Sequence, residues 1–142
     1  MELYKEDPEL IKATIPRWPL FVFLFCAFLC LFFSSSFHLF YVKDIKTNKY
    51  LQRMDYAGIS ILIAGSTTPG YFYGFYCNQS MAFPYVGLIL TTCTSVFLMS
   101  LTDWFHRPEH LHIKSWIYGM LGVSAGFPLI HLAINEYFPL IL

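Results

Sequence analysis

The length of its uncharged stretches constrains this chain more than any other feature. Residues 18–42, 56–102 and 115–135 contain no Asp, Glu, Lys or Arg. A helix of about 20 apolar residues spans the roughly 30 Å hydrocarbon core of a bilayer. The middle stretch is too long for one such helix, and it divides at the polar turn Cys77-Asn78-Gln79-Ser80. The sequence therefore predicts an all-α, polytopic membrane protein with four transmembrane helices, at about 19–42, 54–76, 82–103 and 114–135.

Composition supports the membrane class and argues against others. Hydrophobic residues make up 56% of the chain and charged residues 13%, which is about half the charged fraction of a soluble domain. The formal net charge is zero, so we expect no nucleic acid as a partner. As partners of a membrane protein we expect membrane lipids and other membrane protein chains. Cys26, Cys30 and Cys93 lie in apolar stretches, where free cysteine behaves as a small hydrophobe. Cysteine spacing favours neither a disulfide framework nor a zinc ribbon.

The distribution of basic residues predicts an orientation. Residues 1–15 form a polar N-terminal segment, too acidic for a mitochondrial presequence and too polar for a signal peptide, and residues 16–142 form the transmembrane domain. The loops 43–53 and 104–113, with their helix edges, carry six basic residues against three on the other side. The six are Lys43, Lys46, Lys49, Arg53, Arg107 and Lys114. The positive-inside rule places both loops on the cytoplasmic or matrix-equivalent side of a plasma, endomembrane or mitochondrial inner membrane.

Polar residues at two neighbouring helix ends form the candidate site. Ser34 and His38 are four residues apart and share a helix face, and Asp55 opens the next span, so all three lie near one membrane surface. Ionisable residues inside membranes are costly and mark functional sites. Two interpretations remain open. His38 and Asp55 bond each other, Arg53 or water, or they form a zinc half-site in which Asp55 binds directly or through a water.

The other histidines are weaker candidates. The helical rise places His131 near the opposite membrane surface from His38, so we expect it to bond a neighbouring helix or the backbone freed by Pro128. Three more histidines cluster in one loop, where solvated histidines are more common than metal ligands: His106, His110 and His112.

Further side chains are expected to be structural. Asp103 is expected to pair with Arg107 or to face water. The segment 65–70 is expected to loosen the second span, with its hydroxyls bonding the freed carbonyls. Small residues should allow close helix approach in the fourth span, and aromatic residues should form an interfacial belt. These sets are Gly119, Gly122 and Gly126, and Tyr71, Phe72, Tyr73, Phe75 and Tyr76.

Six stretches carry a family resemblance by their order and spacing. They are Arg17-Trp-Pro-Leu-Phe-Val-Phe, Ser34-Ser-Ser-Phe-His38-Leu-Phe, Met54-Asp55-Tyr-Ala-Gly-Ile, Leu62-Ile-Ala-Gly-Ser66, Pro69 with Tyr73-Gly-Phe-Tyr-Cys77, and Leu121-Gly-Val-Ser-Ala-Gly-Phe-Pro128-Leu-Ile-His131. Together they resemble the progestin and adipoQ receptor family, which includes adiponectin receptors, plant heptahelical proteins and the hemolysin III group. The Ser-x-x-x-His and Asp-Tyr-x-Gly-Ile blocks are signatures of that family, and the resemblance covers residues 16–138.

The resemblance implies a fold and a metal site. The family fold has seven transmembrane helices, and this chain is similar to the second to fifth. By position, His38 matches a zinc-binding histidine, Asp55 the acidic residue that approaches the metal, in some states through water, and Ser34 the serine one turn before the histidine. The family's other two zinc ligands come from a His-x-x-x-His pair in the last helix. The one such spacing here joins His106 to His110 in a loop, so the site of the lone chain is expected to be incomplete and non-catalytic.

Three hypotheses for function follow. In the first and favoured one, the chain is a non-catalytic accessory or structural subunit of a larger membrane assembly, without a cofactor of its own. In the second, another chain supplies helices that complete a zinc site for ceramidase-like amide hydrolysis or for receptor signalling. In the third, the chain is an incomplete product of an ordinary seven-helix receptor gene. The groups that lie beside His38 distinguish the first two.

Overall fold

Long helices make up most of the chain. The computed structural model describes the backbone of residues 15–76 and 79–141 and the side chains of residues 15–76 and 80–135. Residues 1–14 of the predicted N-terminal segment, and Cys77 and Asn78 of the predicted turn, lie outside the described residues. The described helices are α2 (Trp18–Phe40), α3 (Ile45–Gly74), α4 (Gln79–Ser100) and α5 (Leu111–Ile141). Two short 3-10 turns, η2 (Trp104–His106) and η3 (Pro108–His110), connect α4 to α5.

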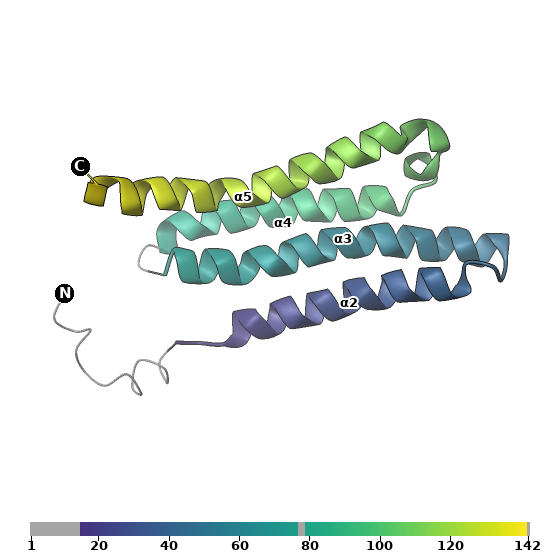
Figure 1. Cartoon of the computed structure of the whole chain (residues 1–142), viewed down its shortest axis with the longest axis horizontal. Helices are drawn as coiled ribbons and strands as arrows, with labels where there is room; N and C mark the ends of the chain where they lie inside the picture. The colour runs from purple at the N-terminus through teal and green to yellow at the C-terminus, as the bar shows by residue number, and fades with distance from the viewer. Residues whose placement is uncertain (1–14, 77–78, 142) are drawn as a thin grey trace.

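Each helix runs antiparallel to the next along the chain (Figure 1). The α2–α3 turn and the α4–α5 connection lie at the same end of the molecule, and α2 begins and α5 ends at the other. We call the first end the basic end, because the two connections and the first turns of α3 and α5 carry the six basic residues counted above. The predicted all-α fold of a polytopic membrane protein is confirmed.

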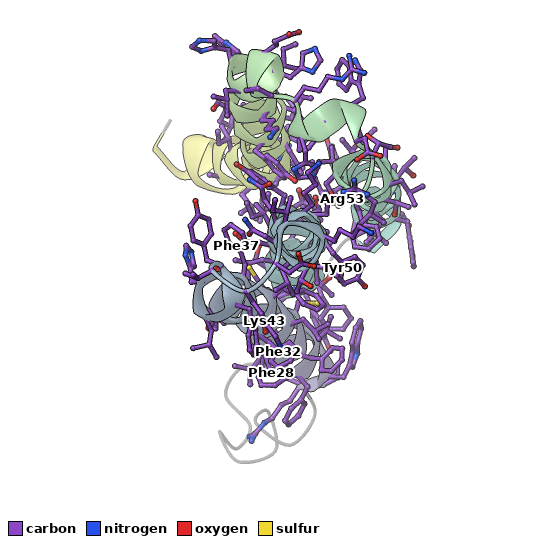
Figure 2. All side chains as sticks on the ribbon, turned by 90° about the vertical axis from the view of Figure 1, so that its right-hand side faces the viewer. Phe28, Phe32, Phe37, Lys43, Tyr50 and Arg53 are labelled. Carbon is purple, nitrogen blue, oxygen red and sulfur yellow. The ribbon has the colours of Figure 1, made fainter. Side chains whose placement is uncertain are left out.

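α3 is the central helix of the bundle and the least apolar. Among the described residues, the segments Trp18–Phe40, Ser80–Ser100 and Pro108–Asn135 are long and apolar enough to cross a membrane. α3 packs against α2, α4 and α5. Protein therefore covers more of α3 than of its neighbours, which explains why small and polar residues replace large apolar ones along its length. By contrast, Phe28 and Phe32 are exposed and lie on the side of α2 turned away from the other helices (Figure 2).

The predicted loop 43–53 is wrong over most of its length. The chain is non-helical only from Tyr41 to Asp44, and α3 begins at Ile45 rather than near residue 54. The prediction ended the span where charges begin, but Lys, Gln, Arg, Leu and Met are good helix formers. They extend the helix past the apolar core. The other boundaries differ from prediction by up to three residues, except that α5 continues to Ile141 rather than ending near residue 135.

Two glycines of α3 allow α2 to pack closely against it. A Cβ on Gly65 would collide with Cβ of Cys26 and lie 2.7 Å from its Sγ, and one on Gly58 would lie 3.2 Å from Cα of Cys30. The close approach predicted at the α5 glycines is not made by any other helix of the described residues. No atom of the described residues lies within 4 Å of a Cβ built at these positions: Gly119, Gly122 and Gly126.

The proline of α3 does not interrupt the helix. α3 remains helical through Pro69, and three hydroxyls at 66–68 bond carbonyls one turn earlier. Thr67 and Thr68 donate to the Ala64 carbonyl at 3.0 and 2.9 Å, and Ser66 donates to the Ile63 carbonyl at 3.0 Å. The prediction that these hydroxyls bond the carbonyl freed by the proline is therefore wrong. Their acceptors are the carbonyls of Ile63 and Ala64. The carbonyl of Gly65 lacks its usual partner, because residue 69 is proline and has no N–H.

Aromatic residues of α3 form part of the core instead of an interfacial belt. Tyr71 and Phe75 are 1% and 4% exposed, which corrects the prediction that they face the membrane surface. The Tyr71 hydroxyl donates to the Ala125 carbonyl of α5 at 2.6 Å. Tyr76, one turn after Phe72, is exposed as a belt residue should be. The hydrophobic core thus lies between α3, α4 and α5.

Candidate functional site at the basic end

Helix pairing brings the three predicted site residues to one level. Ser34 and His38 lie one turn apart on α2, and Asp55 lies one turn before Gly58 on α3. Because Gly58 contacts Cys30 and the two helices run in opposite directions, Asp55 lies level with the α2 turn that holds Ser34 and His38. His38 is exposed, whereas Ser34 and Asp55 are half-buried. Among the described residues, no hydrogen bond joins His38 to Asp55. Their relative position therefore depends on how α2 packs against α3.

His38 and Asp55 by themselves do not fit a catalytic zinc ion. Such a site takes three protein ligands and leaves a fourth position for water or substrate. Among the residues that the structure describes, no group of three or more His, Cys, Asp or Glu side chains is placed to hold a metal ion. Two donors on adjacent helices are therefore half of a donor set, and any completing ligands must come from groups outside the described residues.

Arg53 ties α3 to the end of α4. Its guanidinium forms an ion pair with Asp103 and donates from Nη1 to the Leu101 carbonyl at 3.3 Å. Figure 2 shows Arg53 on the side of α3 that faces α4, away from Phe37. This corrects the expected pairing of Asp103 with Arg107, whereas the alternative expectation that Asp103 faces water agrees with its side chain being 86% exposed. Sequence proximity favoured Arg107, but the antiparallel packing of α3 and α4 brings Arg53 closer.

His106 is a fixed residue of the α4–α5 connection and not a solvated one. Its Nε2 lies 2.7 Å from the Ser100 carbonyl, and its ring contacts Tyr56 edge-on at 5.6 Å between centroids. Because a carbonyl only accepts, Nε2 carries the hydrogen. Burial lowers the pKa of His106 below its ordinary value, and the charges of Lys114 and Arg53 act in the same direction. The bond to Ser100 and the charge of Asp103 oppose this shift but do not outweigh it.

Lys114 is the residue that sequence reasoning missed. Lysines at the ends of spans usually extend to the membrane surface, but Lys114 is only 4% exposed. Its ammonium lies 4.9 Å from the ring centroid of Tyr56 and 5.4 Å from that of Phe105, as cation–π contacts. Tyr118 adds a hydrogen bond to the Tyr56 carbonyl at 2.8 Å. The sequence signal for this buried lysine was the position of Tyr56 and Phe105 beside the two charged segments.

His110 and His131 have structural contacts, and His112 is exposed. His110 Nδ1 lies 2.9 Å from the Trp104 carbonyl, and its ring stacks on that indole at 4.2 Å. At the opposite end, His131 Nδ1 lies 3.1 Å from the Tyr85 hydroxyl of α4, and Nε2 lies 3.0 Å from Nδ2 of Asn135. The prediction that His131 bonds a neighbouring helix is confirmed. It lies far along α5 from the basic end, so it cannot join His38 at a metal.

Comparison with known proteins gives one family. The haemolysin-III-related family matches residues 5–139 of the chain. The chain is 35% identical over 137 residues to the heptahelical transmembrane protein ADIPOR3 of Oryza sativa subsp. japonica. This match covers 92% of the chain and 34% of that protein. It is 31% identical over 114 residues to the adiponectin receptor protein of Drosophila melanogaster, which covers 80% of the chain and 26% of that protein.

Both matches cover only part of the relative. The chain spans about a third of the rice protein and about a quarter of the fly protein. The similarity covers the four helices and the residues Ser34, His38 and Asp55, whereas most of each relative lies outside the matched region.

Proposed function

The chain belongs to the haemolysin-III-related family, and on that premise we propose that it is a non-catalytic, membrane-embedded subunit of a larger helical assembly. One observation carries this proposal. The glycines of α5, at positions 119, 122 and 126, follow one face of the helix with nothing packed on them from the described residues.

Such a face suits helix association in a membrane. Without a hydrophobic force between helices in lipid, close approach at small residues supplies the packing energy. The glycines lie on a different face from Met120 and Ser124, which line a groove of about 420 Å³ against α4. A second helix could therefore dock on the glycine face of α5 without displacing α4.

The donor set at the basic end supports the non-catalytic part of the proposal. His38 and Asp55 supply two donors where a catalytic zinc needs three protein ligands. The His-x-x-x-His spacing of His106 and His110 does not complete the set, because no group of three or more such side chains is placed to hold a metal ion among the described residues. No reaction step is assigned to these residues.

The assembly is tested by changing the glycine face. Gly122→Leu and Gly126→Leu should reduce the size of the complex that contains the full chain after cross-linking in its own membrane and purification. Val123→Leu is the matched control, because Val123 is 68% exposed on a neighbouring face. A chain that migrates as a monomer, or a complex of unchanged size in all three variants, would contradict the proposal.

A second candidate function is supported by the exposure of His38. An exposed histidine beside a half-buried carboxylate is open to ligands from another chain, which would complete a zinc site for ceramidase-like amide hydrolysis or for receptor signalling. Zinc content of the purified full chain distinguishes the two candidates. The first predicts equal, substoichiometric zinc in the wild type and in His38→Ala. About one zinc per chain, lost in His38→Ala and reduced in Asp55→Asn, would overturn it in favour of the second.

A further inference from the structure

A polar pocket opens at the basic end, between the first turns of α3 and the α4–α5 connection. Its volume is about 360 Å³. The residues that line it are Lys49, Gln52, Arg53, Asp103, His106, Arg107 and Pro108. It lies on the α4 side of α3, whereas His38 belongs to α2 on the other side, so the pocket is separate from the predicted metal site.

The walls of the pocket carry an excess of positive charge. Lys49, Arg53 and Arg107 are cationic, and Asp103 is the one acidic lining residue. Asp103 is already paired with Arg53. Two cationic side chains, Lys49 and Arg107, therefore remain uncompensated within the lining, and both are exposed.

Two of the lining residues each have a buried nitrogen without a hydrogen-bond partner among the described residues. These nitrogens are Nε of Arg53 and Nδ1 of His106. Arg53 uses Nη1 and Nη2 for Leu101 and Asp103, so its Nε–H remains as a donor. Buried polar groups in proteins are almost always bonded to protein, water or ligand. The Nε–H of Arg53 is therefore an unused donor beside the pocket, whereas Nδ1 of His106, with the ring hydrogen on Nε2, can only accept.

The level of the pocket in the membrane indicates the source of its occupant. Arg53 lies three residues before the uncharged stretch of α3 begins at Tyr56, and Arg107 lies between the spans of α4 and α5. Two exposed aromatic residues, Tyr50 and Trp104, lie at the same level. Aromatic side chains of this kind mark the headgroup layer of a bilayer. Basic pockets between helices at this level bind acidic lipid headgroups.

We infer that the pocket binds the phosphate group of an anionic membrane lipid, held by Lys49, Arg53 and Arg107, with His106 at its inner wall. The lipid would hold the start of α3 against the α4–α5 connection at the basic end. This inference does not depend on the proposed assembly, because every residue that carries it belongs to this chain and none lies on the glycine face of α5.

The full chain in lipid nanodiscs tests the inference. Discs of phosphatidylcholine are compared with discs that also contain phosphatidic acid, and the lipids that remain bound after transfer to detergent are counted by native mass spectrometry. The wild type should retain phosphatidic acid. Lys49→Gln and Arg107→Gln should each weaken its retention about ten-fold, the effect of losing one hydrogen bond between charged groups.

The matched control removes the same charge outside the pocket. Lys43 lies beside α2, with its ammonium over the Phe40 ring, and Figure 2 shows it well away from Arg53. Lys43→Gln should retain phosphatidic acid as the wild type does. Equal loss in Lys43→Gln and Arg107→Gln would show general surface attraction and overturn the inference.

A second arm separates a lipid from free phosphate. Inorganic phosphate added to the phosphatidylcholine discs should not protect the chain against thermal unfolding, whereas phosphatidic acid should raise its melting temperature. Equal protection by inorganic phosphate would assign the pocket to a soluble anion and overturn the lipid source. Equal melting temperatures of wild type and Lys49→Gln in pure phosphatidylcholine would show that the variant folds.

Discussion

Single glycines determine how closely α2 and α3 pack. We predict that Gly65→Ala destabilises the bundle, because the new Cβ would collide with Cβ of Cys26, which is attached directly to backbone. Overpacking of this kind costs about 1–3 kcal/mol, which outweighs the gain in helix propensity of about 1 kcal/mol. Thermal unfolding of the full chain in nanodiscs measures the difference. Gly87→Ala in α4 is the control, because its Cβ would meet open space. Equal stability of the two variants would contradict the predicted contact.

His106 should make stability depend on pH in one direction. Its pKa in the folded chain is lowered from 6.5, chiefly by burial, with Lys114, Arg53 and Asp103 as the charges that face it. The unfolded chain therefore takes up the proton first as pH falls below about 6.5, and the folded state loses stability there. His106→Gln keeps a donor for the Ser100 carbonyl but cannot titrate. We expect the wild type to lose more thermal stability than His106→Gln between about pH 7.5 and about pH 5.5. The same loss in both proteins would exclude His106 as the source.

The site residues show which contacts a sequence can predict. Ser34, His38 and Asp55 could be placed at one level because helical spacing and span ends fix their height in the membrane. The partner of Asp103 could not be predicted, because it depends on the side of α3 that faces α4. The burial of Lys114 was missed for the same reason. Tyr56 and Phe105 come together over its ammonium only when α3 and the α4–α5 connection pack.

Among the elements, α3 departs most from the prediction, and its first turns can be tested directly. We predict that Gln52→Pro destabilises the chain by about 3 kcal/mol, because a proline inside a helix removes a hydrogen bond and clashes with the preceding turn. Ile45→Pro should be tolerated, since Ile45 is the first helical residue and its N–H has no partner within the helix. Thermal unfolding of both variants in nanodiscs makes the comparison. If residues 45–53 formed the loop that the sequence predicted, the two prolines would have similar effects.

The four helices were predictable because their uncharged stretches are long, whereas the start of α3 was not. Charge marks where a helix leaves the hydrocarbon core, but it does not end the helix, and Ile45–Arg53 continues past that boundary. The glycines show a second limit. Gly58 and Gly65 form the close contact, although sequence reasoning assigned that role to the glycines of α5. Spacing shows that small residues share a face, but it does not show which helix covers that face.

For the whole molecule, one experiment tests both the orientation in the membrane and whether α3 crosses it. α3 lies outside the segments that are apolar enough to cross a membrane by composition, yet its two neighbours along the chain are antiparallel to it and are among those segments. We predict that α3 crosses because α2, α4 and α5 shield its polar residues. A glycosylation acceptor loop inserted after Lys43 should stay unmodified in endoplasmic reticulum membranes, and one inserted after Asn78 should be modified.

These two insertions separate three arrangements of the molecule. Modification after Asn78 alone means that α3 crosses and that the basic end is cytoplasmic, as the excess of basic residues predicts. Modification after Lys43 alone would mean that the bundle crosses in the reverse orientation. The same result at both positions would mean that α3 does not cross, so that α2 and α4 enter the membrane from opposite sides. That outcome would conflict with the packing of α3 between α2 and α4, whose Gly65 contact with Cys26 needs the two helices at the same depth.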